Sequence, residues 1–209
     1  MYKKITLLIG NGFDKSCDLK SAYTDMYEGY ISSESKSPTI EKFKEELDTD
    51  ITTWADFEMA MCSYMKSFSN EKEFLECLHD FRDYLTGHLE AEEAKFEKKL
   101  GRRLLKKCQE EIRDSFRTIQ NYAFPEGERY TTVFSAICFN YTKVADMVFN
   151  SYNLNVAKIV HVHGTLDDSP VMGINDPAQF GADIPYPITA DIITEYVKPS
   201  FNREYDRKR

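Results

Sequence analysis

This sequence lacks several features that would assign a protein to a particular class. Its five cysteines are an odd number, are widely spaced and form no C-x-x-C pair, so the sequence predicts neither a disulfide framework nor a zinc ribbon. No apolar run approaches the roughly 20 residues that span a bilayer, and no signal-peptide cleavage pattern follows the start of the chain. These absences predict a soluble, cytoplasmic protein with no membrane partner.

Basic residues are also scarce relative to acidic ones. The 209 residues include 27 Lys and Arg against 35 Asp and Glu, which gives a formal net charge of -8. Affinity for a phosphate backbone comes mainly from Lys and Arg, so we expect no duplex DNA partner. A chain of this length, 42% hydrophobic, can bury a core of its own as one large domain.

Short apolar runs with β-branched residues predict four strands. These runs lie at residues 3–9, 131–139, 156–162 and 171–174. Helical patterns separate them, including short helices at 143–152 and 189–201. Strands that alternate with helices predict the α/β class, with a Rossmann-like, doubly wound parallel sheet.

An all-helical block at residues 21–124 interrupts this alternation after the first strand. Its longest stretch, residues 70–124, carries an apolar stripe that steps mostly by four. One unbroken helix of that length would measure about 80 Å, so we expect a break at Gly87 or Gly101 and an antiparallel helical pair. A long coiled-coil arm is the alternative. We therefore predict one domain over residues 1–209 with the helical block as a large insertion, a cap or lid.

Ligands of open parallel sheets bind outside the carboxyl ends of the strands, so polar residues at strand ends are candidate site residues. The first strand is followed by Gly10-Asn11-Gly12-Phe13-Asp14. Glycines at alternate positions allow backbone conformations and close approaches that a Cβ would block, and such a turn can present backbone N–H groups to a phosphate. Lys15 stands where G-x-G-x-x-G has its third glycine, so a plain strand-to-helix turn is an equal alternative.

The second candidate is Asn140-Tyr141-Thr142, which follows the strand that ends at Phe139. Asn140 carries one acceptor and two donor hydrogens on a short stem, which suits a sugar hydroxyl or a water molecule. A helix N-cap is the alternative role, because Asn and Thr are preferred there. Thr142 can cap the next helix and leave Asn140 for a ligand.

The third candidate is His161-Val162-His163-Gly164. Histidines two apart in a strand face the same side. His163, at the exit of the strand, is placed to act as a general base near neutral pH, whereas His161 is expected to be a satisfied core histidine. Two histidines on one face can begin a metal site, but no glutamate or cysteine follows at a familiar spacing, so we predict no metal.

Cysteine chemistry is a competing interpretation, with Cys138 as nucleophile and His163 as base. Cys138 lies inside an apolar strand, where a raised thiol pKa and poor access are expected. We therefore predict that Cys138 is not catalytic.

Five short motifs, spread over most of the chain, carry a family resemblance. They are Ile9-Gly10-Asn11-Gly12-Phe13-Asp14, Leu19-Lys20-Ser21-Ala22-Tyr23-Thr24-Asp25, Trp54-Ala55-Asp56-Phe57-Glu58, Phe139-Asn140-Tyr141-Thr142 and His161-Val162-His163-Gly164. In this order they resemble the AbiH family of bacterial abortive phage infection proteins. The chain departs from the family pattern at Asp18, where a glycine is usual, and at Ser21 and Met26, where Thr and Phe are usual. Family members tend to continue with a further strand, so the resemblance implies either a short member or a truncated one.

The three strand ends also resemble, more distantly, sirtuin-type NAD-binding domains used in phage defence. That resemblance implies that the turn at residues 10–12 cradles the pyrophosphate, that Asn140 lies by the nicotinamide ribose and that His163 is the base. Asp14 stands where that family has Ser. The zinc-binding cysteine quartet of deacetylating sirtuins is absent from this sequence, which favours NAD cleavage over peptide deacetylation.

Together the resemblances imply a phage-defence protein that binds NAD and hydrolyses its nicotinamide–ribose bond, with Asn140 and His163 as catalytic residues. The residues expected to bind the nucleotide are Gly10, Asn11, Gly12, Phe13, Asp14, Tyr141, Thr142 and Gly164. The alternative is a non-catalytic nucleotide-binding sensor or interaction module. A phage-derived trigger and a second copy of the chain are the expected partners. An RNA-directed nuclease finds little support, because the chain is acidic and shows no carboxylate cluster of metal-site type.

Overall fold

The structure is a computed structural model that describes most of the chain. It describes residues 2–48, 57–99, 131–151 and 156–198 without 169, 171, 175, 181 and 182, together with residues 106, 110, 114, 115 and 118. Within these ranges, no helix combines the length and the apolar composition that crossing a membrane requires.

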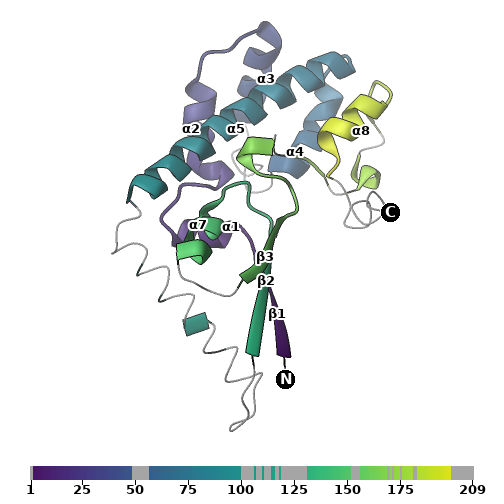
Figure 1. The fold of residues 1–209 in the computed structure, drawn as a ribbon. Coiled ribbons are helices and arrows are strands. Elements are labelled where there is room, and N and C mark those ends of the chain that lie inside the picture. Colours follow the sequence, from purple (N-terminus) through teal and green to yellow (C-terminus); the bar gives the residue numbers. More distant parts are fainter. Residues whose placement is uncertain are drawn as a thin grey trace. The chain divides into compact units, whose positions relative to one another are not determined.

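Three parallel strands form the sheet. In spatial order they are β1 (Tyr2–Ile9), β2 (Thr131–Cys138) and β3 (Val156–His161) (Figure 1). The backbone register pairs Ile9 with Cys138, and Cys138 with His161. The three strands therefore end side by side at one edge of the sheet, which confirms the predicted α/β class and parallel sheet.

Helices α1 (Asn11–Ser16) and α7 (Val144–Ser151) pack against one face of this sheet. Alternate strand residues face them, as the pleat requires. The buried members of this cluster are Ile9, Ala136, Cys138, Ala145 and Phe149, with Leu7, Phe13 and Ile159 packed beside them. On the opposite face, Leu8 is 73% exposed. A doubly wound sheet carries helices on both faces, so the Rossmann-like fold stays a prediction.

The fourth predicted strand, at residues 171–174, is wrong. Ile174 instead forms an isolated parallel bridge with Val197, just after the short helix α8 (Ala190–Tyr196). Gly173 makes this close approach feasible, because a Cβ there would lie 1.8 Å from the Tyr196 carbonyl oxygen. A bridge of this kind needs one backbone contact, whereas a strand needs a ladder, and an apolar sequence of four residues does not distinguish them.

Contacts within the chain cluster in two compact units. Unit 1 comprises Met1–Lys20 and Leu89–Thr165, and unit 2 comprises Ser21–His88 and Leu166–Arg209. The sheet, α1 and α7 belong to unit 1. The predicted single domain over residues 1–209, with a helical insertion at 21–124, stays a prediction.

Helix α5 (Glu71–Lys99) supplies residues to both units. It runs unbroken through Gly87, so the break predicted there is wrong. The other predicted break, Gly101, lies outside the described residues. A glycine inside a helix costs roughly 1 kcal/mol relative to alanine, and the burial of Leu85 and Leu89 on either side outweighs that cost.

Aromatic side chains fill the core of unit 2. Besides α8 and the first part of α5, its described helices are α2 (Tyr23–Ser32), α3 (Pro38–Asp48) and α4 (Phe57–Tyr64), with the 3₁₀ turns η2 (Met65–Ser67), η3 (Leu166–Asp168) and η4 (Pro177–Gln179). Phe57 stacks on Phe81 with ring centroids 3.7 Å apart, and Tyr30 meets Phe81 edge to face at 5.0 Å. All three rings are fully buried, so the helices of unit 2 have a core of their own.

Candidate functional site

A buried carboxylate, Asp14, lies where the first two strands end. Asp14 sits on α1, just after β1, and is 1% exposed. Its Oδ1 accepts a hydrogen bond from Asn140 Nδ2 at 2.8 Å, and its Oδ2 accepts one from the Thr142 hydroxyl at 2.5 Å. The segments that follow β1 and β2 are therefore tied together through one side chain.

Asn140 contacts the glycine turn as well as Asp14. Its Nδ2 donates a second hydrogen bond, at 3.1 Å, to the carbonyl oxygen of Gly10, and the residue is 8% exposed. The alternative role of a helix N-cap does not describe Asn140 or Thr142, because α7 begins at Val144 and their side chains bond to the α1 segment. Gly10, Asp14, Asn140 and Thr142, far apart in the sequence, thus share one network.

Burial raises the pKa of Asp14 to about 6, because a charged carboxylate loses its hydration there. The hydrogen bonds from Thr142 and Asn140 favour the charged form and limit the rise in pKa, as does the positive charge of His161. The negative charge of Glu93 on α5 adds to the rise. Asp14 therefore changes charge closer to neutral pH than an ordinary aspartate does, which is typical of residues at functional sites.

His161, the last residue of β3, is bound at both ring nitrogens. Nε2 lies 2.9 Å from Asp146 Oδ2, and Nδ1 lies 3.2 Å from the backbone carbonyl oxygen of Asn140. The hydrogen bond with Asp146 is the main reason that the pKa of His161 rises to about 10; Cys138 adds to the rise and burial opposes it. His161 is therefore protonated at neutral pH and donates from both nitrogens, one of them to the Asn140 backbone.

His163 lies beyond the end of β3, in a turn. Strand alternation stops at His161 and does not determine which side His163 faces, so the prediction that both histidines face the same side stays a prediction. Gly164 follows with a φ of 79°, in the left-handed region that favours glycine. The His163 ring meets Phe139 edge to face at 5.7 Å and lies 6.3 Å from the Tyr141 ring. The turn after β3 thus contacts the loop after β2.

Gly10 and Gly12 are exposed, and neither has the positive φ that would require a glycine. Among the described glycines, a positive φ occurs at Gly164 and Gly173, whereas Gly10 has an ordinary extended backbone with φ −122°. A Cβ added at Gly10 or Gly12 would meet no atom within 4 Å. The turn itself therefore tolerates a side chain. Glycine at these positions leaves the backbone next to Asn140 uncovered.

Two further residues of the predicted site lie on the first turn of α1. Asn11 is exposed. Phe13 packs into the core on the helix-bearing face of the sheet, with its ring centroid 6.0 Å from that of Phe149. These contacts explain Phe13 as a core residue, and its predicted part in nucleotide binding stays a prediction.

Just after helix α1, the backbone of one residue lies in the left-handed region. Asp18 has a φ of 64°, its N–H donates to the Lys15 carbonyl, and the N–H of Leu19 donates to the Asp14 carbonyl at 3.1 Å. This pattern is a Schellman motif, whose left-handed position is usually glycine. The backbone therefore explains why a glycine is usual where this chain has Asp18.

Two glutamates of α5 were missed as site residues by the sequence analysis. Glu92, 7% exposed, accepts a hydrogen bond from the backbone N–H of Lys20 at 3.0 Å. Glu93 accepts one from the backbone N–H of Lys143 at 2.5 Å, just before α7. Phe96, one turn further along α5, joins the buried cluster that includes Cys17, Leu19, Val144 and Val148. In sequence these glutamates look like solvated residues of a charged helix, and no local signal distinguishes them.

The described residues also bear on metal binding and on the role of Cys138. In the described part of the chain, no group of three or more His, Cys, Asp and Glu side chains is arranged to hold a metal ion. Cys138 is fully buried and interacts with the His161 ring. Its predicted lack of a catalytic role stays a prediction.

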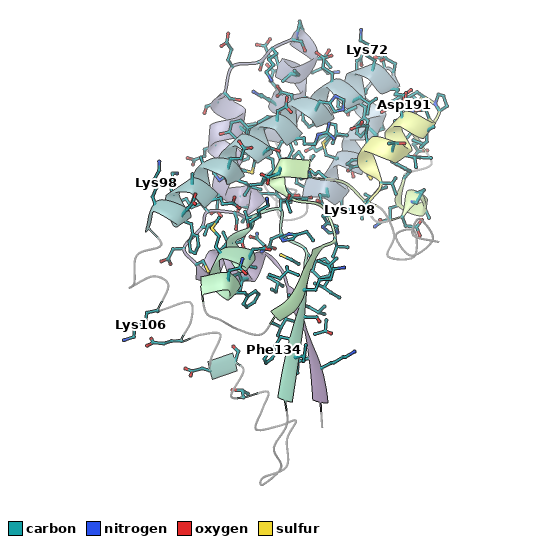
Figure 2. All side chains as sticks on the ribbon, viewed as in Figure 1. Lys72, Lys98, Lys106, Phe134, Asp191 and Lys198 are labelled. Atoms are coloured by element: carbon teal, nitrogen blue, oxygen red, sulfur yellow. The ribbon has the colours of Figure 1, made fainter. Side chains whose placement is uncertain are left out.

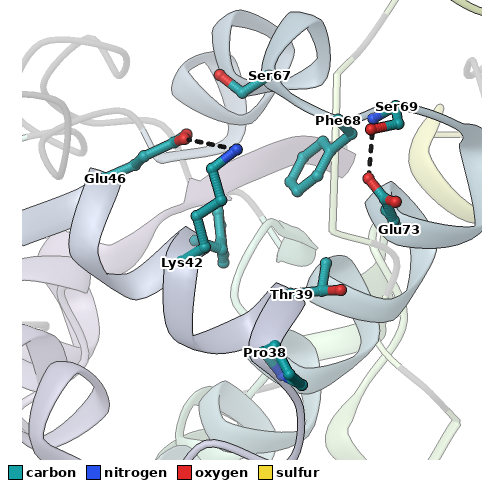
Figure 3. A pocket seen from close by; sticks show the side chains of 9 residues that line it. Pro38, Thr39, Lys42, Glu46, Ser67, Phe68, Ser69 and Glu73 are labelled. Carbon is teal, nitrogen blue, oxygen red and sulfur yellow. Dashed lines mark hydrogen bonds and ion pairs between the residues drawn. The ribbon is translucent and has the colours of Figure 1, made fainter.

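Unit 2 contains two shallow hollows. One, of about 250 Å³, lies between α3 and the start of α5, with the Lys42–Glu46 ion pair at its rim and Phe68 pointing into it (Figure 3). The other, of about 420 Å³, is lined by residues of α5 and α8 that include Lys72 and Asp191, both labelled in Figure 2. Neither contains a residue of the predicted site.

The second and third sequence motifs meet inside unit 2. The Tyr23 hydroxyl donates to Glu58 Oε1 at 3.0 Å, and the other carboxylate oxygen of Glu58 forms an ion pair with Lys198, which is 7% exposed. Trp54, Ala55 and Asp56 of the third motif lie outside the described residues. The described motif residues therefore tie α2, α4 and the segment after α8 to one another.

A sequence model of one family, described as bacteriophage abortive infection AbiH, matches residues 6–207 of the chain. The chain belongs to the AbiH family. The predicted family is thereby confirmed, and the family description places the chain among bacteriophage abortive infection proteins. No curated protein and no solved structure matched this AbiH chain. The more distant resemblance to sirtuin-type domains stays a prediction.

Proposed function

We propose that this AbiH-family chain acts in abortive infection by binding NAD at the strand ends of unit 1 and hydrolysing its nicotinamide–ribose bond. The observation that carries the proposal is the shared network at those ends: Asn140 donates to the Gly10 carbonyl and to Asp14. His163 contacts the loop that contains Asn140 through the rings of Phe139 and Tyr141. The three predicted site segments therefore adjoin at the edge where parallel sheets bind ligands.

The exposed turn at Gly10 and Gly12 suits the pyrophosphate, because a phosphate can approach the backbone closely where no Cβ stands in the way. Phe139, 39% exposed and edge to face with His163, offers an aromatic surface for a planar base. These features support a nucleotide as the ligand. NAD carries both groups, as other nucleotides do, and the sirtuin-type resemblance is what favours NAD among them.

The proposed reaction is a hydrolysis. The bond between ribose C1′ and the nicotinamide nitrogen breaks, and its electron pair stays on the nicotinamide ring, which becomes neutral. The transition state resembles an oxocarbenium ion. Water adds to C1′ and gives its proton to His163, so the products are nicotinamide and ADP-ribose. Asn140 orients the water or a ribose hydroxyl for this step.

The direct test is an assay of nicotinamide release by the full chain, with the variants Asn140→Ala and His163→Ala. Each is expected to lower kcat at least about 100-fold, because positioning and proton transfer each contribute roughly that much. Asn150→Ala, an exposed position on α7, and His88→Ala on α5 are matched controls. Both controls are expected to keep wild-type activity, and thermal unfolding verifies that each variant folds.

A nucleotide-binding sensor is the second candidate, and one observation favours it: Asn140 is 8% exposed and already uses its amide nitrogen inside the protein. Calorimetric titration with NAD and ADP-ribose separates the two. Binding without nicotinamide release supports the sensor. Release that persists in both site variants contradicts the assignment of Asn140 and His163, and absence of both binding and release contradicts the nucleotide proposal.

A further inference from the structure

The hydrogen bonds around Asn140 determine which way its side-chain amide faces. The amide has two donor hydrogens on Nδ2 and one acceptor, Oδ1. The Gly10 carbonyl oxygen can only accept a hydrogen bond, and it lies 3.1 Å from Nδ2. Asp14 Oδ1, 2.8 Å from Nδ2, is an acceptor as well, since the Thr142 hydroxyl supplies a donor to the other carboxylate oxygen. Two acceptors on one side require the nitrogen to face them.

The backbone of Asn140 is held independently. Protonated His161 donates from Nδ1 to the Asn140 carbonyl oxygen, while its Nε2 is bound by Asp146. Both the main chain and the side chain of Asn140 therefore have fixed partners from three different segments of unit 1. Constraints on both the main chain and the side chain are typical of a residue whose orientation is important for function.

We infer that Asp14 is a positioning residue: it holds the Asn140 amide so that Oδ1 is the atom presented to the ligand, where it accepts a hydrogen bond from an O–H group. This inference rests on the proposed function and specifies it. The matching ligand group is a hydroxyl donor, which is either a ribose hydroxyl or the attacking water. A phosphate oxygen or a carbonyl cannot take this place, because both are acceptors.

The test compares Asp14→Ala with Asp14→Asn. Alanine removes the acceptor beside Asn140 Nδ2, so the amide can turn and kcat for nicotinamide release is expected to fall about tenfold or more. Asparagine keeps an acceptor oxygen toward Asn140 and a donor nitrogen toward Thr142, so it is expected to restore kcat to within about threefold of wild type. A purely charge-based role of Asp14 would not produce this rescue.

The two sources of the hydroxyl are separated by the binding constant of ADP-ribose. If Oδ1 holds the attacking water, Asp14→Ala lowers kcat and leaves the Kd of ADP-ribose unchanged. If it holds a ribose hydroxyl, the Kd rises as well. Both results support the inference, and an Asp14→Ala variant with wild-type kcat and wild-type Kd overturns it. An Asp14→Asn variant as impaired as Asp14→Ala overturns it too.

A second measurement does not depend on activity. The side-chain amide protons of Asn140, identified by their loss in Asn140→Ala, are expected to exchange slowly in wild type and Asp14→Asn and quickly in Asp14→Ala. Asp14→Leu, which lacks an acceptor but fills space, replaces the alanine variant if that one unfolds. Val148→Ala, a fully buried position on α7, controls for lost stability alone and is expected to keep slow exchange. Slow exchange in wild type without any NAD turnover would contradict the proposed function while leaving the Asp14 contact intact.

Discussion

Asp14 in unit 1 is a buried carboxylate and Glu58 in unit 2 is a partly buried one, 18% exposed, and the two are satisfied in different ways. Asp14 accepts hydrogen bonds from two neutral groups, the Asn140 amide and the Thr142 hydroxyl. Glu58 is bound by the Tyr23 hydroxyl and by the ammonium group of Lys198, which is 7% exposed. A full opposite charge bonds directly to the Glu58 carboxylate, whereas the direct partners of Asp14 are neutral and the positive charge of His161 makes a smaller contribution.

Because of this difference, Asp14 is a candidate site residue, whereas the Glu58–Lys198 ion pair has a structural role. With neutral donors, burial dominates and brings the pKa of Asp14 to about 6, so the group can change charge under mild conditions. In the ion pair of Glu58 with Lys198, the loss of either charge would leave the other without its charged partner. Three variants test the contrast.

The largest effect is expected from Lys198→Met in unit 2. Removing the cation leaves the Glu58 carboxylate, which is 18% exposed, without its charged partner, and breaking this mostly buried pair costs about 4 kcal/mol of unfolding free energy. Thermal unfolding should show a fall in Tm on the order of 10 °C.

The matched control is Lys42→Met, which removes the exposed ion pair with Glu46 and should cost less than about 0.5 kcal/mol. The double variant Glu58→Gln with Lys198→Met should recover part of the loss, because no lone charge remains. Equal losses of unfolding free energy in Lys198→Met and Lys42→Met would show that the Glu58–Lys198 pair stabilises the protein no more than an exposed ion pair does.

The next effect is expected from Asp14→Asn, measured as a function of pH. The pKa of Asp14 is raised in the folded state, so its contribution to stability is complete below about pH 4 and is lost as the pH rises through 6. The unfolding free energy of wild type, relative to Asp14→Asn, should therefore fall by about 3 kcal/mol between pH 4 and 7. Urea unfolding at a series of pH values measures this difference.

A difference between the two proteins that stays constant with pH would mean that Asp14 titrates at its ordinary pKa. In that case the contrast between neutral and charged partners fails. Asp14→Asn itself should stay folded across the range, because an amide can bond to both Asn140 and Thr142.

The smallest effect is expected from Asp18→Gly, which tests whether the backbone around Asp14 carries strain. Asp18 has a φ of 64°, where a side chain costs about 1 kcal/mol and glycine costs nothing. The variant should therefore raise Tm by roughly 2–4 °C. Asp18→Ala keeps the Cβ and should give no gain. If alanine stabilises as much as glycine, strain at this position is not the cause.

Local pattern predicted the framework of the site well. The apolar runs that became β1, β2 and β3 end at the residues where polar groups begin, because a buried strand cannot continue through Gly10 or Asn140. Parallel strands share a carboxyl edge, so the nearness of the strand ends follows from topology alone. The family resemblance followed from the same motifs and is confirmed by the match over residues 6–207.

Other features had no local signal. A helix break was predicted at Gly87 or Gly101. Helix α5 continues through Gly87, because buried residues on both sides outweigh the propensity of one glycine, and Gly101 lies outside the described residues. The charged face of α5 was predicted to be solvated, yet Glu92 and Glu93 bond to the backbones of Lys20 and Lys143. These hydrogen-bond partners lie 50 and 72 residues away in the sequence, so the periodicity of the helix does not predict the bonds.

Short-range chemistry in the chain was enough to establish the parallel strands, the helices between them and the polar residues at their ends, since hydrophobic period and turn residues act over a few positions. Tertiary packing alone decided that Asp14 would be buried beside Asn140 and Thr142, and that His161 would be paired with Asp146. Desolvation and hydrogen-bond geometry depend on which distant groups meet in space. For that reason the charge state and the orientation of the site residues follow from the tertiary structure and cannot be predicted from local sequence.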